Sequence, residues 1–239
     1  MRGYDMGTKL RQGGYVIGLL FGTAAWAQDA PVEAPAEAEA AVEAPAAEPA
    51  APVTYKVSAS QSKLAVLVKY DRNALIAGHD HVVQTAQPSG TVVWNPADPS
   101  QCKVDISFPA SSLEVDPAGT REAFGIEGTT SASDKGKILA NLLGKRQIDA
   151  DNHPTITYTS SSCKASGSGF EVQGALTLHG VTKLVNTQMT IDASEGSFKA
   201  SGRFSATHED FGMKPFTAAL GALRNDTNLG FRVDVVAAP

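Results

Sequence analysis

The histidines are the residues of this chain whose spacing could support metal chemistry. His79 and His81 lie two positions apart in a Gly-His-Asp-His run, so on a strand both rings face the same side. Two imidazoles can bind one metal ion, but a complete site needs a third or fourth ligand. Asp80, His179 and His208 are the candidates. The alternative is a polar loop whose histidines bind backbone groups, and the spacing leaves both interpretations open.

Other arrangements typical of enzymes are missing from the sequence. It contains no G-x-S-x-G nucleophile motif and no glycine-rich loop of the kind that cradles phosphate. The neighbouring carboxylates Glu209 and Asp210, and likewise Glu114 and Asp116, are expected to be solvated loop residues. We therefore expect no catalytic residue, no required cofactor and no enzymatic activity.

The two cysteines, Cys102 and Cys163, favour a disulfide over a metal site if the protein is exported. The bond would close a loop of 61 residues. One observation opposes it, because Cys163 is out of phase with Ile156 and Tyr158 along the predicted strand. A bend near residues 160–162 would be needed, and two free thiols are the alternative.

The elements that must position these residues are mainly β-strands. Apolar and polar residues alternate in short segments separated by turn signals, which is typical of strands with one buried face. The predicted strands are 55–58, 62–70, 82–85, 90–94, 103–108, 155–158, 169–178, 183–191, 197–207 and 228–236. Eight or so antiparallel strands predict a sandwich or a closed barrel, and periodicity alone does not separate the two.

One stretch, residues 174–183, predicts a hairpin that bends at His179-Gly180. Alternating small or apolar residues precede the bend, and a second, less polar row follows it. Glycine supplies the backbone freedom that a tight turn needs. We expect His179 to hydrogen-bond the turn rather than contact a ligand.

One amphipathic helix interrupts the strands. Ser133 is the predicted N-cap and Gly144 the predicted end. Between them, apolar residues form a stripe on one face: Ile138, Leu139, Leu142 and Leu143. A second short helical piece is predicted at 216–223.

Small residues lie on the inward faces of several predicted strands, namely Gly174, Ala200, Gly202 and Ala206. They could leave space for a ligand, since an eight-stranded barrel is just wide enough to hold one. They could equally mark bulges or tight curvature. The sequence does not decide between these interpretations.

The chain divides into three predicted parts. Residues 1–27 have a basic start, an apolar run and an Ala-Trp-Ala cleavage site, which predict a cleaved signal peptide, with a retained anchor as the alternative. Residues 28–52 are almost entirely Ala, Pro, Glu and Val and predict a disordered tether. Residues 53–239 form the folded domain. The net charge of −5 argues against a nucleic-acid partner, and the signal predicts a periplasmic or secreted protein.

Four motifs give the chain a resemblance to a known family. Residues 176–183 (Leu-Thr-Leu-His-Gly-Val-Thr-Lys), 153–158 followed by two serines, 139–149 and 210–213 (Asp-Phe-Gly-Met) occur in the family's order. With them, the chain resembles the YceI-like family of exported, lipocalin-like barrel proteins associated with polyisoprenoid binding. Residues 216–225 depart from the pattern and look like an insertion.

The resemblance implies an all-β fold: an antiparallel, lipocalin-like β-barrel of about eight strands with one amphipathic helix. It also implies an apolar tunnel that holds a long isoprenoid, such as a quinone or a polyprenyl lipid, for carriage or storage. The expected lining residues are Val66, Val68, Phe108, Phe170, Leu176, Phe204, Phe211 and Phe231. Ordinary core packing is the alternative for each of them. A metal-binding or stress-linked protein that uses His79 and His81 is the alternative function, and membrane proximity and oligomerisation stay open.

Overall fold

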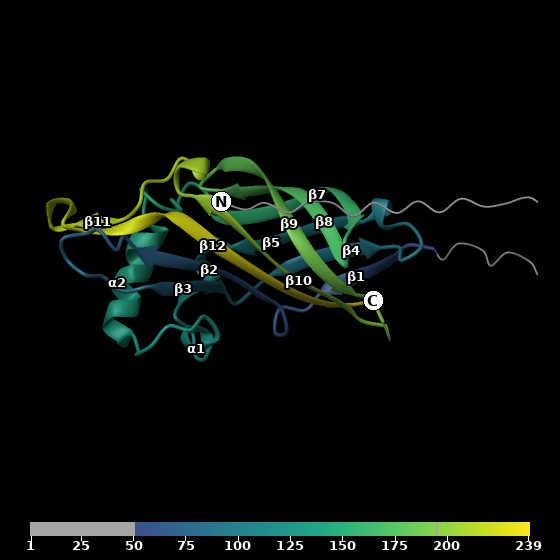
Figure 1. The fold of residues 1–239 in the computed structure, drawn as a ribbon, viewed down its shortest axis with the longest axis horizontal. Helices are drawn as coiled ribbons and strands as arrows, with labels where there is room; N and C mark the ends of the chain where they lie inside the picture. Colours follow the sequence, from purple (N-terminus) through teal and green to yellow (C-terminus); the bar gives the residue numbers. More distant parts are fainter. Residues whose placement is uncertain (1–50, 195) are drawn as a thin grey trace, which may run out of the picture. The chain divides into compact units, whose positions relative to one another are not determined.

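The strands predicted from the sequence form a barrel. The structure is a computed structural model that describes residues 51–194 and 196–239, so the predicted signal peptide and nearly all of the predicted tether lie outside the described residues. Two helices, α1 (Thr120–Ala123) and α2 (Ala132–Leu143), accompany the strands (Figure 1). In chain order the strands are β1 (Val53–Val57), β2 (Lys63–Tyr70), β3 (His81–Thr85), β4 (Ser89–Trp94), β5 (Lys103–Pro109), β6 (Leu113–Val115), β7 (Thr155–Ser166), β8 (Gly169–Leu178), β9 (Val181–Asp192), β10 (Phe198–Thr207), β11 (Thr217–Ala218) and β12 (Leu223–Ala238).

The barrel closes because its first and last strands pair. Around the barrel the order is β1-β4-β5-β7-β8-β9-β10-β12, and β12 returns to β1 through the pairs Lys56–Ala238 and Val57–Ala237. Each of these pairings is antiparallel. Closure removes the unpaired edges that an open sandwich would keep. The predicted eight-stranded antiparallel barrel is therefore confirmed.

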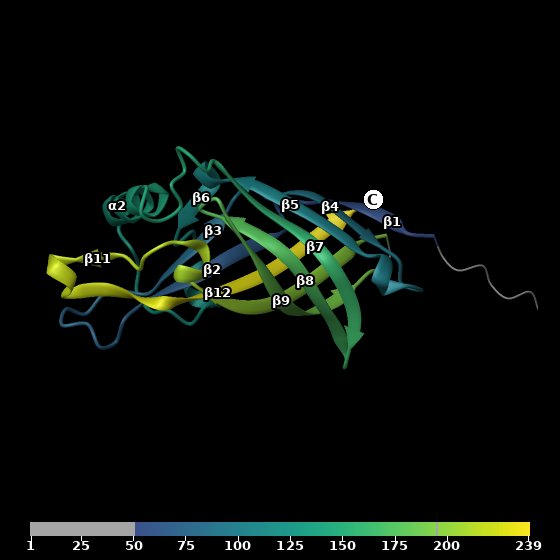
Figure 2. The same ribbon diagram turned by 90° about the horizontal axis from the view of Figure 1, so that it is seen from above.

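Strand β12 serves two sets of neighbours because it is 16 residues long. One edge pairs with β10, and the other pairs first with β2 and then with β1. From β2 the sheet continues to β3 and β6. Figure 2 shows this three-stranded extension beside α2 at one end of the domain and β1 at the other. We call the end that carries α2 the mouth end, and the end that carries β1 the closed end.

The buried apolar residues form two clusters, one towards each end. The closed-end cluster contains Tyr55, Val92, Trp94, Cys102, Ile106, Cys163, Val172, Phe198, Ala200, Val235 and Ala237. The mouth-end cluster contains Val83, Ala110, Leu113, Val115, Ile148, Ile156, Leu176, Leu178, Val185, Phe211, Met213 and Leu229. Residues of both clusters line one cavity, so the inward faces of the strands build a continuous apolar interior.

The predicted amphipathic helix forms as α2, but it begins earlier than the sequence indicates. Ser131, not Ser133, is the N-cap, because its hydroxyl accepts a hydrogen bond from the backbone N–H of Asp134 at 3.1 Å. The helix ends at Gly144 as predicted. Its apolar stripe packs against the mouth-end cluster.

Two other helical predictions are corrected. The short helix α1 is additional to the single helix predicted. The predicted helical piece at 216–223 is instead β11 followed by one 3-10 turn, Ala219–Gly221. Here β11 pairs with β12, and Asn225 N donates to Phe216 O at 2.9 Å. Pairing with a neighbouring strand thus satisfies backbone groups that a helix would satisfy internally.

The structure joins Cys102 to Cys163, so the predicted disulfide is confirmed. The bend that the prediction required is a β-bulge in β7, where the register shifts between Ser160 and Ser162. Because of the bulge, the side chain of Cys163 points into the barrel, as that of Ile156 does. The two Cα atoms lie 6.0 Å apart, within the usual range for a disulfide.

Candidate ligand-binding tunnel and its mouth

The inner faces of the strands enclose an apolar tunnel. It contains about 1290 Å³ of space free of protein atoms, part of which is open to solvent. Its polar wall residues are few: Thr157, Tyr158, Thr187 and Arg232. Such a wall can desolvate a long apolar chain, but it offers few hydrogen bonds to a polar one.

Six of the eight predicted lining residues lie in cavity walls: Val66, Val68, Phe108, Leu176, Phe204 and Phe231. Phe204 and Phe231 face each other across β10 and β12, with their rings stacked 4.5 Å apart. The other two lie elsewhere. Phe211 is fully buried in the mouth-end cluster, and Phe170 packs edge-on against Trp94 at 4.9 Å. Ligand contact remains a prediction for all eight residues.

The inward glycines make room for protein side chains. A Cβ atom at Gly174 would collide with the ring of Tyr158, and one at Gly202 would collide with the Met189 side chain. Gly174 also lies opposite the β7 bulge. The bulge interpretation therefore holds for Gly174. Burial of the Tyr158 ring in the tunnel wall raises the pKa of its phenol to about 12.

A second, more polar cavity continues the tunnel at the mouth end. It contains about 1170 Å³ of space free of protein atoms, part of which is again open to solvent. The two cavities share wall residues, namely Val66, Val83, Leu142, Ile148, Leu178 and Phe231. Polar side chains line the mouth: Tyr70, His79, His81, Asn141, Gln147, His208 and Asn225. The interior thus runs from an apolar tunnel to a mouth rich in hydrogen-bonding groups.

The two histidines of the Gly-His-Asp-His run both lie in the mouth. Their ring centroids are 6.5 Å apart, and His81 Nδ1 is 2.8 Å from Asp116 Oδ2. Among the residues that the structure describes, no three or more His, Cys, Asp or Glu side chains are grouped so that they could hold a metal ion. A metal at His79 and His81 would therefore rely on this pair alone, short of the ligand number usual for zinc.

Asp116, which the sequence predicts to be solvated, is buried instead, with 2% of its surface exposed. Its carboxylate accepts hydrogen bonds from His81 Nδ1 at 2.8 Å, Thr130 Oγ1 at 2.6 Å and Val82 N at 2.7 Å. Burial alone would raise the pKa of Asp116, but these bonds together hold it well below its usual range. The carboxylate is therefore the centre of a polar network under the mouth.

Arg121 and Lys135 extend this network to both helices. In α1, Arg121 Nη1 lies 3.2 Å from Asp116 Oδ2 and donates to Asp80 O at 2.9 Å. In α2, Lys135 Nζ donates to the backbone oxygen of Asp116. None of the α2 residues, all of which the structure describes, is fully buried. Polar bonds as well as apolar packing therefore fix the helices beside the mouth.

His208, a candidate metal ligand in the sequence, lies in the mouth wall, and only 2% of its surface is exposed. Its Nδ1 lies 2.9 Å from Thr227 O. Because a carbonyl oxygen can only accept, Nδ1 carries the proton and Nε2 of the neutral ring is an acceptor. Burial lowers the pKa of His208, partly offset by the Thr227 bond and Asp226, which favours this neutral form.

The predicted hairpin between β8 and β9 turns at His179-Gly180 as expected. Both residues have positive φ, 53° and 71°, as a type I′ turn requires. The expected hydrogen bond from the histidine is not seen: His179 Nδ1 is buried and has no partner among the described residues. Gly180 packs against the ring of His153, which a Cβ atom would strike. The turn thus owes its shape to backbone conformation and ring packing.

Comparison with known proteins agrees with this architecture. The sequence profile of the YceI-like domain matches residues 55–235, nearly the whole barrel. The UPF0312 protein ECA1782 of Pectobacterium atrosepticum is 26% identical over 153 residues, which cover 62% of this chain and 69% of that protein.

Solved structures show the same fold. BcnA of Burkholderia cenocepacia superposes with a TM-score of 0.57 at 19% identity, covering 76% of this chain and 99% of BcnA. A mutant YCEI protein of Campylobacter jejuni superposes with a TM-score of 0.51 at 16% identity, covering 69% of this chain and 86% of that one. At these identities the likeness establishes the fold alone.

Proposed function

Because the chain belongs to the YceI-like domain family, we propose that it is an exported binding protein that holds a long apolar isoprenoid, such as a quinone or a polyprenyl lipid. The observation that best supports this function is the continuity of the apolar tunnel with the polar mouth. An isoprenoid tail suits the tunnel because it needs no hydrogen bonds there. A polar head group suits the mouth. The protein would carry or store the lipid without chemical change.

The mouth offers both kinds of hydrogen-bonding partner to a head group. His208 is buried and neutral, so its Nε2 can accept from a hydroxyl. The side-chain amides of Gln147 and Asn225 can donate to a carbonyl oxygen. Gln147 is already oriented, because its Nε2 donates to Lys214 O at 2.6 Å. A quinone, a quinol or a polyprenol would each find a partner in this mouth.

The disulfide supports a location outside the cytoplasm. The Cys102–Cys163 disulfide is of the kind that persists in oxidising compartments. Neither α1 nor α2, the two helices of the described part of the chain, has the length and apolar character needed to cross a membrane. We infer a periplasmic or secreted protein.

A block placed in the tunnel tests this function. Val66 lies in the walls of both cavities, so Val66→Trp should obstruct the passage between them. Organic extraction and mass spectrometry of the purified wild type should yield about one lipid per protein, and the variant severalfold less. Lys69→Trp, on an exposed position of the same strand, is the matched control. A wild type without lipid, or equal lipid in Val66→Trp, would reject the proposal.

A further inference from the structure

Large aliphatic side chains are exposed on two loop tips beside the mouth. Leu75 is 89% exposed and Ile76 48% exposed in the loop between β2 and β3. Leu220 is fully exposed in the turn between β11 and β12. A single exposed aliphatic residue is ordinary, whereas a group of them on adjoining loops suggests an interaction surface. We call these three residues the apolar rim.

The two loops are bonded to each other, so the rim is one surface. Ile76 N donates to Ala222 O at 2.8 Å, and Asp71 N donates to Arg224 O at 2.9 Å. The side chain of Arg224 also binds that of Asp71 at 2.6 Å. These bonds hold both loops as a common projection beyond the barrel.

The backbone that presents Leu220 is itself unusual. Ala219, Leu220 and Gly221 have φ values of 48°, 55° and 89°, so two residues with side chains occupy the left-handed region. Glycine or asparagine adopts this conformation more readily than leucine does. A leucine that is fully exposed on a disfavoured backbone gains nothing from packing within the fold. Strain of this kind is often retained at functional positions.

The rim continues the lining of the ligand cavity. The β2–β3 loop also supplies Ala77 and Gly78 to the mouth wall, and Phe216 and Leu223, at the base of the β11–β12 hairpin, line it as well. In Figure 1, β11 lies at the opposite end of the domain from β1 and the end of β12. The rim can therefore meet an extended surface while the start of the described chain faces away from it.

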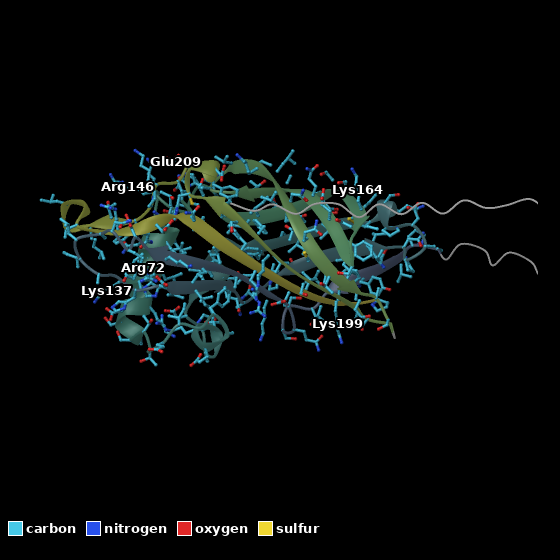
Figure 3. The ribbon with its side chains drawn as sticks, viewed as in Figure 1. Arg72, Lys137, Arg146, Lys164, Lys199 and Glu209 are labelled. Carbon is cyan, nitrogen blue, oxygen red and sulfur yellow. A yellow bond between two sulfur atoms is a disulfide. The ribbon has the colours of Figure 1, made fainter. Side chains whose placement is uncertain are left out.

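Exposed cations accompany the rim at this end. Lys145, Arg146 and Lys214 are exposed around the mouth, and the Arg72 side chain is 58% exposed although it also binds Asp80 at 2.6 Å. Figure 3 shows Arg72 and Arg146 on the half of the domain that carries α2 and β11. Aliphatic side chains flanked by cations match a bilayer, whose acyl layer accepts the first and whose anionic phosphates attract the second.

We propose that the apolar rim docks the mouth on a phospholipid bilayer that carries anionic head groups, with Leu75, Ile76 and Leu220 inserted among the acyl chains. A lipid could then pass between the bilayer and the tunnel with its tail shielded from water throughout. The inference rests on the proposed function for the identity of the cargo, but the docking surface is argued from the rim itself.

Vesicle flotation tests the docking. The full chain is mixed with vesicles of phosphatidylethanolamine and phosphatidylglycerol, and the floated fraction is measured. The double variant Leu75→Asn, Leu220→Asn should partition at least tenfold more weakly, and asparagine suits the left-handed backbone at 220, so folding is preserved. Leu184→Asn removes a leucine that is 62% exposed on β9 and should bind as the wild type does. Thermal unfolding of each variant confirms that it is folded.

Two results would overturn the docking: a wild type that stays unbound, or a double variant that floats with the vesicles as the wild type does. A wild type that dimerises through the rim and leaves vesicles unbound would assign the rim to a second copy and also overturn it. Lipid extraction separates this proposal from the proposed function. A double variant that keeps its lipid but loses flotation supports docking. A wild type that floats but carries no lipid upholds docking and rejects lipid carriage.

Discussion

A single buried residue, Asp116, connects the mouth to both helices: its carboxylate lies beside Arg121 of α1, and its backbone oxygen accepts from Lys135 of α2. The carboxylate accepts three hydrogen bonds from two segments, two from His81 and Val82 in β3 and one from Thr130 before α2. In the interior such bonds are strong, and the loss of one partner leaves the others unsatisfied. The stability of the mouth therefore depends on a residue that does not line the tunnel.

Replacing this carboxylate should destabilise the protein measurably. We expect Asp116→Asn to lower the free energy of unfolding by about 2–3 kcal/mol, because the amide cannot accept from His81, Thr130 and Val82 as the carboxylate does. Glu114→Gln, an exposed position on β6, should change it by less than about 0.5 kcal/mol. Urea unfolding at neutral pH measures both. Equal values for the two variants would contradict the role of Asp116.

The same residue should make stability depend on pH in the acid range. Its pKa in the folded protein lies below the ordinary value of 3.8, so the unfolded chain binds the proton more readily. The stabilisation is therefore complete above the unfolded pKa and is lost as the pH falls through the folded pKa. Unfolding free energies measured from neutral pH down to about pH 3 should fall less steeply in Asp116→Asn than in the wild type. Identical slopes would show that the group does not titrate differently on folding.

Strand alternation identified tunnel residues better than it identified polar ones. Alternation places a side chain inward or outward, and this is enough to bring Val66, Leu176 and Phe231 into the walls. Asp116 could not be recognised in this way, because its side-chain partners lie between 5 and 35 positions away in the chain. Only the folded topology brings those partners together.

At the scale of elements, the turn of the β8–β9 hairpin has a residue, His179, that is not the preferred one for its turn type. Type I′ turns prefer Asn-Gly, and His179 occupies the asparagine position with a buried, unpartnered Nδ1. His179→Asn should therefore raise the free energy of unfolding by about 1 kcal/mol. Gly180→Ala should lower it, because φ is positive there and the added Cβ would strike His153. Chemical denaturation of both variants tests the sign, and a less stable His179→Asn would show that the imidazole contributes packing that outweighs its unpaired nitrogen.

The sequence predicts an irregularity or boundary of an element correctly where nearby residues alone determine it. The phase conflict at Cys163 indicated a bend in β7, and the structure shows a bulge there. The segment 216–223 was different, since its alanines and leucines favour a helix by propensity. Pairing with β12 overrides that preference, and this pairing depends on where the rest of the barrel places β12. The N-cap is Ser131 and not the predicted Ser133, because the Ser131 hydroxyl is the one that accepts from the backbone N–H of Asp134.

At the scale of the whole molecule, the two ends of the barrel differ in composition: polar and exposed groups gather at one end, and apolar packing fills the other. The mouth end combines the polar network, the histidines and the exposed rim. The closed end consists of apolar packing around the Cys102–Cys163 disulfide. Resemblance and alternation predicted the barrel and the tunnel, but they did not indicate this division. It arises because β12 changes partner from β2 to β1 along its length.

The disulfide should stabilise the domain without governing the mouth. It closes a loop of 61 residues, for which chain entropy gives about 4 kcal/mol. We expect the Cys102→Ala, Cys163→Ala variant to lose about 3–4 kcal/mol of unfolding free energy, as the wild type should under reducing conditions.

Because the bond and Asp116 lie at opposite ends, adding Asp116→Asn should cost as much in this variant as in the wild type, within about 0.5 kcal/mol. A larger difference in urea unfolding would mean that the two ends of the barrel are energetically coupled, and that the closed end takes part in shaping the mouth.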